Sequence, residues 1–167
     1  MANPSKAKGT AWESAVRDYM NKTLGLVDER GKFVDIFSAL NVKRAAQEGA
    51  KDVGDVHAVP FVLECKDVLR PAVPAWLGQA HVEADHAGYP YGVVVHKVRR
   101  AAVARGRVHF SVRTWTRVRL ALGLGAADMR ERYAFVPAVR GIASARWYLT
   151  TDLERFTRLV ADLRAAP

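Results

Sequence analysis

The sequence predicts an α/β protein in which helices flank a small central mixed β-sheet. Short segments rich in Val and aromatic residues alternate along the chain with segments whose apolar residues recur at helical spacing. Half of the 167 residues are hydrophobic, which is enough to bury the core of one domain. No apolar run approaches the length of about 18 residues that spans a bilayer, and the N-terminus lacks the apolar stretch of a secretory signal. We therefore expect a single domain over residues 1–167 that does not associate with membranes.

Three helices are expected from apolar periodicity and from the residues at the helix ends. The first begins at Thr10 and ends before Gly25. The second begins near Pro74, which suits a first helical turn, and is stopped by Gly88. The last runs from a cap at Thr151 or Asp152 to about Arg164.

Strands are expected over residues 53–58, 61–66, 91–98 and 147–150. The first two join around Val59-Pro60 and would form a hairpin, and the third has the continuous apolar character of a buried strand. Residues 33–43 fit either a strand or a helix. Between residues 99 and 144 only a strand near 108–112 and a helix near 114–122 are suggested.

Positive charge is concentrated in one part of the chain. The net charge is +9 at pH 7, and the segment from Lys97 to Arg146 alone holds twelve basic residues against two acidic ones. The rest of the chain, with fourteen basic and fifteen acidic residues, is close to neutral. Eleven of the twelve are Arg, whose planar guanidinium suits phosphate, and Arg113, Arg117 and Arg119 surround Trp115. This pattern favours a surface that binds a nucleic-acid backbone over a merely solvated basic face.

The predicted hairpin brings two acidic residues face to face. A turn centred on Val59-Pro60 pairs residues whose numbers sum to 119, so Asp55 lies opposite Glu64 with Cβ atoms about 5 Å apart. Lys66 shares a strand face with Glu64, whereas Cys65 points the other way. Facing carboxylates destabilise a sheet unless a cation lies between them, and Mg²⁺ prefers such oxygen ligands. The set indicates a phosphoryl-transfer site; the alternative is an exposed cross-strand salt-bridge cluster.

These residues resemble a known motif. Gly54-Asp55, followed after eight residues by Glu64-Cys65-Lys66, resembles the core motif of the PD-(D/E)XK nuclease superfamily, although Gly54 stands where that motif usually has Pro. KGTAWE, residues 8–13, is similar to the K-G-x-x-x-E that opens the first helix of archaeal-type Holliday junction resolvases. Similar compact proteins occur among phage-encoded resolvases. The resemblance covers residues 8–98 well and the last strand and helix loosely, which leaves 99–144 as a basic insertion.

The resemblance implies a restriction-endonuclease-like core and a metal-dependent endodeoxyribonuclease. Asp55 and Glu64 would bind Mg²⁺ (or Mn²⁺), with the backbone carbonyl of Cys65 completing the metal shell. Lys66 would orient or deprotonate the attacking water and stabilise the developing negative charge. Attack by water needs no covalent intermediate, and no Ser, Tyr or Cys is placed to form one.

Two further residues on helices are implied to serve the same site. Glu13 would stand near the metal, unless Thr10 and Glu13 instead form a capping box. Gln79 would belong to the active site, unless it is an ordinary polar residue on the face of its helix. The residues expected to bind DNA share a basic side chain: Arg44, Lys51, Lys97, Arg99, Arg113, Arg117 and Arg119.

Two classes of function therefore remain. The first is an endonuclease, preferably for four-way DNA junctions, with a nicking or linear-DNA enzyme of recombination or packaging as the alternative. The second is a catalytically silent DNA-binding module, which would have no reason to keep opposed charges. Two symmetric cuts in a junction suggest a homodimer. The single cysteine, Cys65, excludes an intrachain disulfide and favours a reducing cytoplasm, which is that of a bacterial host if a phage encodes the chain.

Overall fold

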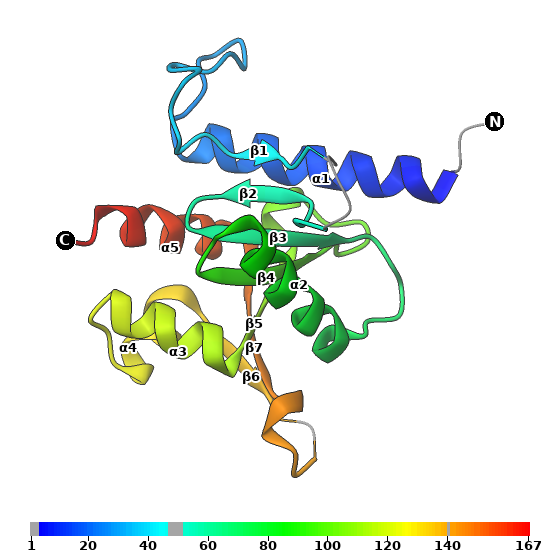
Figure 1. Ribbon diagram of the computed structural model, residues 1–167, viewed down its shortest axis with the longest axis vertical. Coiled ribbons are helices and arrows are strands. Elements are labelled where there is room, and N and C mark those ends of the chain that lie inside the picture. The colour runs from blue at the N-terminus through cyan, green and yellow to red at the C-terminus, as the bar shows by residue number, and fades with distance from the viewer. Residues whose placement is uncertain (1–3, 47–51, 140) are drawn as a thin grey trace.

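The computed structural model describes residues 4–46, 52–139 and 141–167, which form an α/β fold on one open mixed sheet (Figure 1). Its strands are β1 (Lys43–Arg44), β2 (Val56–Ala58), β3 (Phe61–Lys66), β4 (Tyr91–His96), β5 (Arg107–Ser111), β6 (Val136–Ala138) and β7 (Tyr148–Asp152). They lie in the order β1-β2-β3-β4-β5-β7-β6. β3 and β4 run parallel, and the other neighbouring pairs of this sheet are antiparallel. The predicted α/β class with a mixed sheet is therefore confirmed.

Helices pack against both faces of the sheet. They are α1 (Pro4–Thr23), α2 (Val73–Ala87), α3 (Val112–Ala121), α4 (Ala126–Tyr133) and α5 (Leu153–Ala165), with short 3₁₀ turns η1 (Val103–Arg105) and η2 (Ser144–Arg146). The main core lies on the face covered by α1 and α5, where Trp12 and Phe156 are buried. On the other face α2 packs through Leu77 and Ala80 against Val94 of β4. No helix in the described ranges is both long and apolar enough to cross a bilayer.

The predicted helices agree best with this fold where a glycine or a capping side chain marks the end of the helix. α2 ends at Gly88, whose φ of 74° makes a left-handed cap, and the Asp152 side chain caps α5 by accepting from the Arg155 N–H (2.9 Å). α1, in contrast, begins at Pro4, six residues before the predicted start at Thr10. The ambiguous residues 33–43 are irregular until β1 begins at Lys43. β1, β6 and α4 are elements that the sequence pattern does not predict.

The basic segment over residues 99–144 contributes to the sheet as well as to the surface. It contains η1, β5, α3, α4 and β6, and β5 lies between β4 and β7. β5 and α3 correspond to the strand and the helix suggested near 108–112 and 114–122. The Ser111 hydroxyl accepts a hydrogen bond from the Thr114 N–H (3.0 Å) and separates the two elements as a helix cap.

α2 packs on β4 at a point where the strand has no side chain. A Cβ atom on Gly92 would overlap the carbonyl group of Ala80, lying 2.6 Å from its carbon. Only glycine permits this approach of a helix backbone to a strand. The contact therefore fixes the height of α2 above the sheet, and with it the position of every side chain that α2 directs toward β3.

Candidate active site

The β2–β3 hairpin has the predicted register, which brings Asp55 beside Glu64. Ala58 pairs with Phe61, and the pairing continues in that register to the start of β2. Asp55 directly precedes β2, and its Oδ2 atom accepts a hydrogen bond from the backbone N–H of Cys65 (2.7 Å). This bond holds the Asp55 carboxylate next to the end of β3, where Glu64 lies.

Asp55 and Glu64 are largely buried carboxyl groups with raised pKa values. Burial is the main cause and raises the pKa of each to about 7. The charge of Glu64 further raises the pKa of Asp55, and the hydrogen bond from Cys65 opposes it. The ammonium group of Lys66, which contacts the Glu64 carboxylate directly, opposes the rise at Glu64. One lysine therefore does not compensate the two carboxylates.

A third buried carboxyl group, on α2, completes the cluster, and no motif in the sequence points to it. Glu83 is 1% exposed, its carboxyl group lies against the side chains of Glu64 and Gln79, and it forms no ion pair with a described basic residue. Burial raises the pKa of Glu83, and its charge raises the pKa of Glu64. Gln79 lies beside Glu83, one helical turn earlier, and lowers its pKa. This i, i+4 spacing is the one signal in the sequence that could have found Glu83.

Gly54 allows these groups to approach one another. Its φ is +80°, a left-handed conformation that Pro cannot adopt because its ring fixes φ near −65°. A Cβ atom there would also overlap the Val62 side chain and lie 3.3 Å from an oxygen of Glu83. The departure from the Pro of the motif that the sequence resembles therefore has a local cause: this chain turns differently before Asp55.

Lys66 and Cys65 lie where strand alternation predicts. The Lys66 ammonium is on the face of β3 that carries Glu64. The backbone carbonyl of Lys66 accepts a hydrogen bond from the Lys97 N–H (2.9 Å), and this bond joins the ends of β3 and β4. Cys65 packs against the main core on the opposite face. Burial raises the pKa of its thiol well above the ordinary value, so this side chain is unsuited to act as a nucleophile.

Asp55, Glu64 and Glu83 are thus neighbours beside β3, and the Lys66 ammonium contacts one of them, Glu64. No protein-family model, curated protein or solved structure matches this chain. The chemistry of the site must therefore be inferred from its own residues.

The donor set fits Mg²⁺ or Mn²⁺, although it is not arranged as a finished metal shell. Among the described residues, no three His, Cys, Asp or Glu side chains are grouped to hold a metal ion. The carboxylate oxygens of Asp55, Glu64 and Glu83 are nevertheless of the kind that these cations prefer, and among the described residues no basic side chain forms an ion pair with the buried Glu83. A cation bound by Glu64 would compete with the Lys66 ammonium for the same carboxylate.

Glu13 lies at the border of this cluster and is held by Arg44. The Arg44 guanidinium donates to the Glu13 carboxylate, with Nη2 and Oε2 2.6 Å apart. The charge of Glu13 also contributes to the raised pKa of Asp55, which places it nearby. A capping box with Thr10 is excluded, because α1 begins at Pro4 and Thr10 lies inside the helix. Glu13 is therefore held by Arg44 and acts on Asp55 through its charge.

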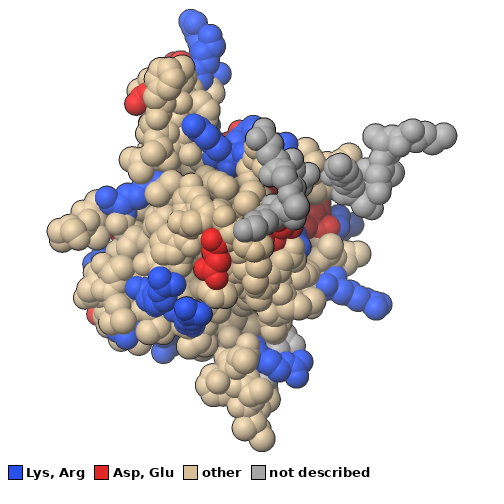
Figure 2. Space-filling model, viewed as in Figure 1, with Lys and Arg blue, Asp and Glu red and all other residues tan. Residues whose placement is uncertain are grey.

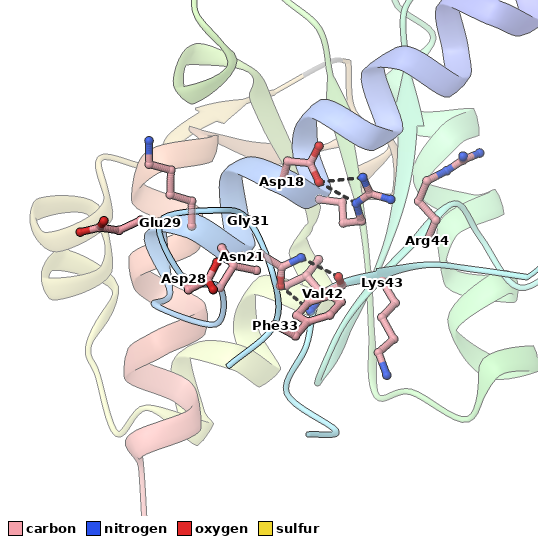
Figure 3. A pocket seen from close by; sticks show the side chains of 12 residues that line it. Asp18, Asn21, Asp28, Glu29, Gly31, Phe33, Val42, Lys43 and Arg44 are labelled. Atoms are coloured by element: carbon pink, nitrogen blue, oxygen red, sulfur yellow. Dashed lines mark hydrogen bonds and ion pairs between the residues drawn. The ribbon is translucent and has the colours of Figure 1, made fainter. Parts of the chain in front are cut away.

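A separate pocket of about 800 Å³ adjoins this border (Figure 3). It lies between α1, the loop that follows α1, and β1, and Arg44 is the one predicted site residue in its lining. Asn21 fixes its floor by exchanging two hydrogen bonds with the backbone of Val42 (2.8 and 2.9 Å). An ion pair between Arg17 and Asp18 lies at its rim. The lining mixes charges of both signs, so this pocket does not suit a polyanion.

The residues predicted to bind DNA do not form one surface. On the face shown in Figure 2, basic side chains are scattered rather than gathered in a patch. Lys97 and Arg99 lie near the active-site end of the sheet, but both pair with Asp67 (2.9 and 3.0 Å), whose side chain is 3% exposed. Lys51 lies outside the described residues.

The three predicted DNA-binding residues on α3 lie at the other end of β4 and contact the protein itself. Arg117 donates to the Pro90 carbonyl (2.9 Å) and lies over the ring of Tyr91, the first residue of β4. Arg119 donates to the Leu124 carbonyl (2.9 Å) and Arg113 lies 3.3 Å from His81. Lys66 is in register with His96, the last residue of β4, whereas Arg117 lies at Tyr91, the first. The length of β4 therefore separates the α3 end of the sheet from Lys66.

The metal-free protein is expected to lose stability as the pH rises from about 4 to 7. Asp55 and Glu64 have pKa values of about 7 in the folded chain and about 4 when unfolded, so the folded state binds more protons between these values. The free energy of unfolding therefore falls with rising pH in this window and levels off above it.

Urea unfolding in EDTA across this pH range measures the effect. Glu64→Gln should flatten the dependence, whereas replacing the exposed Glu131 on α4 by Gln should not. An identical pH dependence in wild type and Glu64→Gln would contradict the burial of an ionisable pair.

Proposed function

We propose that this chain is a metal-dependent DNA endonuclease with a restriction-endonuclease-like core that cleaves four-way junctions. The observation that supports it most is the cluster of three carboxyl groups, Asp55, Glu64 and the buried Glu83, in which the Lys66 ammonium contacts Glu64. Buried carboxylates of this kind cost stability unless a cation joins them. A structural role alone gives no reason to keep them, which also counts against a silent DNA-binding module.

The roles of the residues follow from their positions. Asp55 and Glu64, with the backbone carbonyl of Cys65, would hold Mg²⁺ or Mn²⁺, and Glu83 supplies a further carboxylate. A divalent cation there would lower the pKa of a bound water and neutralise charge on the scissile phosphate. Lys66 orients the attacking water and stabilises the charge that develops on the phosphate.

Gln79 and Glu13 would position the carboxylates and the lysine of the site and would not take part in the reaction themselves. Gln79 lies beside Glu83 and can orient its carboxylate. Glu13, held by Arg44, keeps the entrance to the site polar and can reach the cation through water.

Cleavage of matched DNA substrates tests the proposal. Linear duplex, nicked duplex, flap and four-way junction of equal length are incubated with Mg²⁺, Mn²⁺ or EDTA. Metal-dependent cuts in opposed strands of the junction, made by a dimer as measured by light scattering, are expected. Equal cutting of linear or nicked duplex would leave an endonuclease but remove the junction specificity. Binding without any cleavage in either metal would leave only the DNA-binding module.

A further inference from the structure

A second pocket, of about 560 Å³, lies over strands β5, β7 and β6 of the sheet. Residues of η1 and of the start of α5 complete its lining. Its charged and polar lining includes Arg105, Arg107, His109, Thr150, Asp152 and Arg155. Three arginines therefore share this pocket with a single carboxylate. Arg105 and Arg107 belong to the basic segment from Lys97 to Arg146, but none of the three is among the residues that the sequence predicts to bind DNA.

Asp152 forms ion pairs with two of these arginines, and the third, Arg107, lies opposite it in the register of β5 and β7 without forming one. Its Oδ1 atom accepts the Arg155 backbone N–H (2.9 Å), and its Oδ2 atom contacts the Arg155 guanidinium. Arg105 lies 3.5 Å from the same oxygen, with its side chain 63% exposed. Arg107 is exposed and forms no ion pair with another described residue. The pocket thus has an excess of about two positive charges at neutral pH.

His109 adds a polar group to the pocket without adding charge. It is 4% exposed, and its Nδ1 atom lies 2.8 Å from the Thr150 hydroxyl. Its Nε2 atom is buried and has no hydrogen-bond partner among the described residues. Burial, with the nearby charges of His96 and Arg107, lowers the pKa of His109 to about 3, so the ring is neutral. One imidazole nitrogen in the pocket lining therefore remains unused by the protein.

The pocket lies at the same end of the sheet as the catalytic cluster. Lys66 is in register with His96, and His96 with Arg107, so the three residues form one row across β3, β4 and β5. Neighbouring strands are about 4.8 Å apart, which separates the Cα atoms of Lys66 and Arg107 by about 10 Å. The arginines of α3, at the opposite end of β4, are farther away by the length of that strand. A DNA strand bound at Lys66 would therefore reach this pocket by passing over the buried His96, whose ring contacts Trp76.

We propose that the pocket lined by Arg105, Arg107 and Arg155 binds a backbone phosphate of the DNA substrate away from the scissile bond. This inference rests on the proposed function, because it takes Lys66 as the place of cleavage. The guanidinium groups offer paired donors that match phosphate oxygens. The position at the catalytic edge favours a phosphate within a chain over a free anion.

The salt dependence of DNA binding tests the proposal without requiring cleavage. Arg105→Gln and Arg107→Gln are compared with Arg130→Gln, an exposed arginine on α4, using a fluorescent four-way junction in EDTA. Arg155 is left intact because it takes part in the cap of α5. Each pocket variant should reduce the slope of log K against log salt by about 1 and weaken binding about three- to tenfold at 0.1 M salt. Arg130→Gln should match wild type.

The outcomes separate this inference from the proposed function. Slopes unchanged in both pocket variants would overturn the phosphate site, even if the wild type cleaves DNA. A reduced slope in a protein that cleaves nothing would support the site and overturn the nuclease. Inorganic phosphate serves as a second probe. If phosphate protects the wild type against thermal unfolding in a way that depends on Arg107, while the DNA slope is unchanged, the pocket binds a free anion and the proposal is wrong.

Discussion

Glu64→Gln is expected to lower the rate of metal-dependent DNA cleavage by about 10³-fold, while it stabilises the metal-free protein at pH 8. The loss follows because an amide cannot supply the charge that holds a divalent cation, and removal of one electrostatic element of such a site has about this effect. The gain follows because the carboxylate at position 64 is buried with a pKa raised to about 7, so its ionised form is unfavourable at pH 8. Replacing this carboxylate by an amide should raise the free energy of unfolding at pH 8 by about 2 kcal/mol.

Single-turnover cleavage with Mg²⁺ and urea unfolding in EDTA measure the two effects on the same preparation. Glu131→Gln, on exposed α4, is the matched control and should leave both values unchanged. The opposite signs make the test specific, since a merely misfolded variant would lose both activity and stability. Cleavage within tenfold of wild type would remove Glu64 from the metal site.

Lys66→Met should reduce cleavage by about 10²- to 10³-fold and yet leave binding of Mn²⁺ largely intact. The ammonium group contacts Glu64 and lies where it can meet a substrate phosphate, so its loss removes positive charge needed in the transition state. It is no metal ligand, and its removal frees the Glu64 carboxylate for the cation. Calorimetric titration with Mn²⁺, alongside single-turnover cleavage, separates the two roles.

Lys22→Met, on the exposed surface of α1, is the matched control for the change of charge and shape. The double variant of Glu64→Gln and Lys66→Met should be little worse than Glu64→Gln alone, because residues that act as a unit are not additive. Loss of Mn²⁺ binding in Lys66→Met, or multiplicative losses in the double variant, would mean that Lys66 serves the fold rather than the reaction.

Local signals in the sequence are sufficient for some elements of this fold and not for others. The register of the β2–β3 hairpin follows from the position of its turn, and α2 follows from Pro74 and Gly88. β1, β6 and α4 are short and lack a periodic pattern, so their structure depends on partners distant in sequence. The start of α1 is also not predicted: Thr10 has the residue type of a helix cap and yet lies inside the helix, which begins at Pro4.

The site shows the same division between local and distant information. Asp55, Glu64 and Lys66 come from one hairpin, so the spacing of the residues predicts that they converge. Glu83 joins them only because α2 folds back over β3, and no periodicity reports which face of a helix meets which strand. The arginines show the same limit for predicting where charge lies. The composition reveals the excess of positive charge in the segment around Arg113, but the topology decides which basic groups lie at the end of the sheet with Lys66.

The contact between Gly92 and Ala80 also has a consequence for which side of the proposed site could adjust to a ligand. α2 meets β4 backbone to backbone, so it can move no closer to the sheet, and Glu83 is held at a fixed place beside Glu64. The opposite border depends on the ion pair between Glu13 and the partly exposed Arg44, a kind of contact that water readily replaces. If the proposed site binds a DNA strand, we therefore expect the α2 border to stay in place and the α1 border to adjust to the strand.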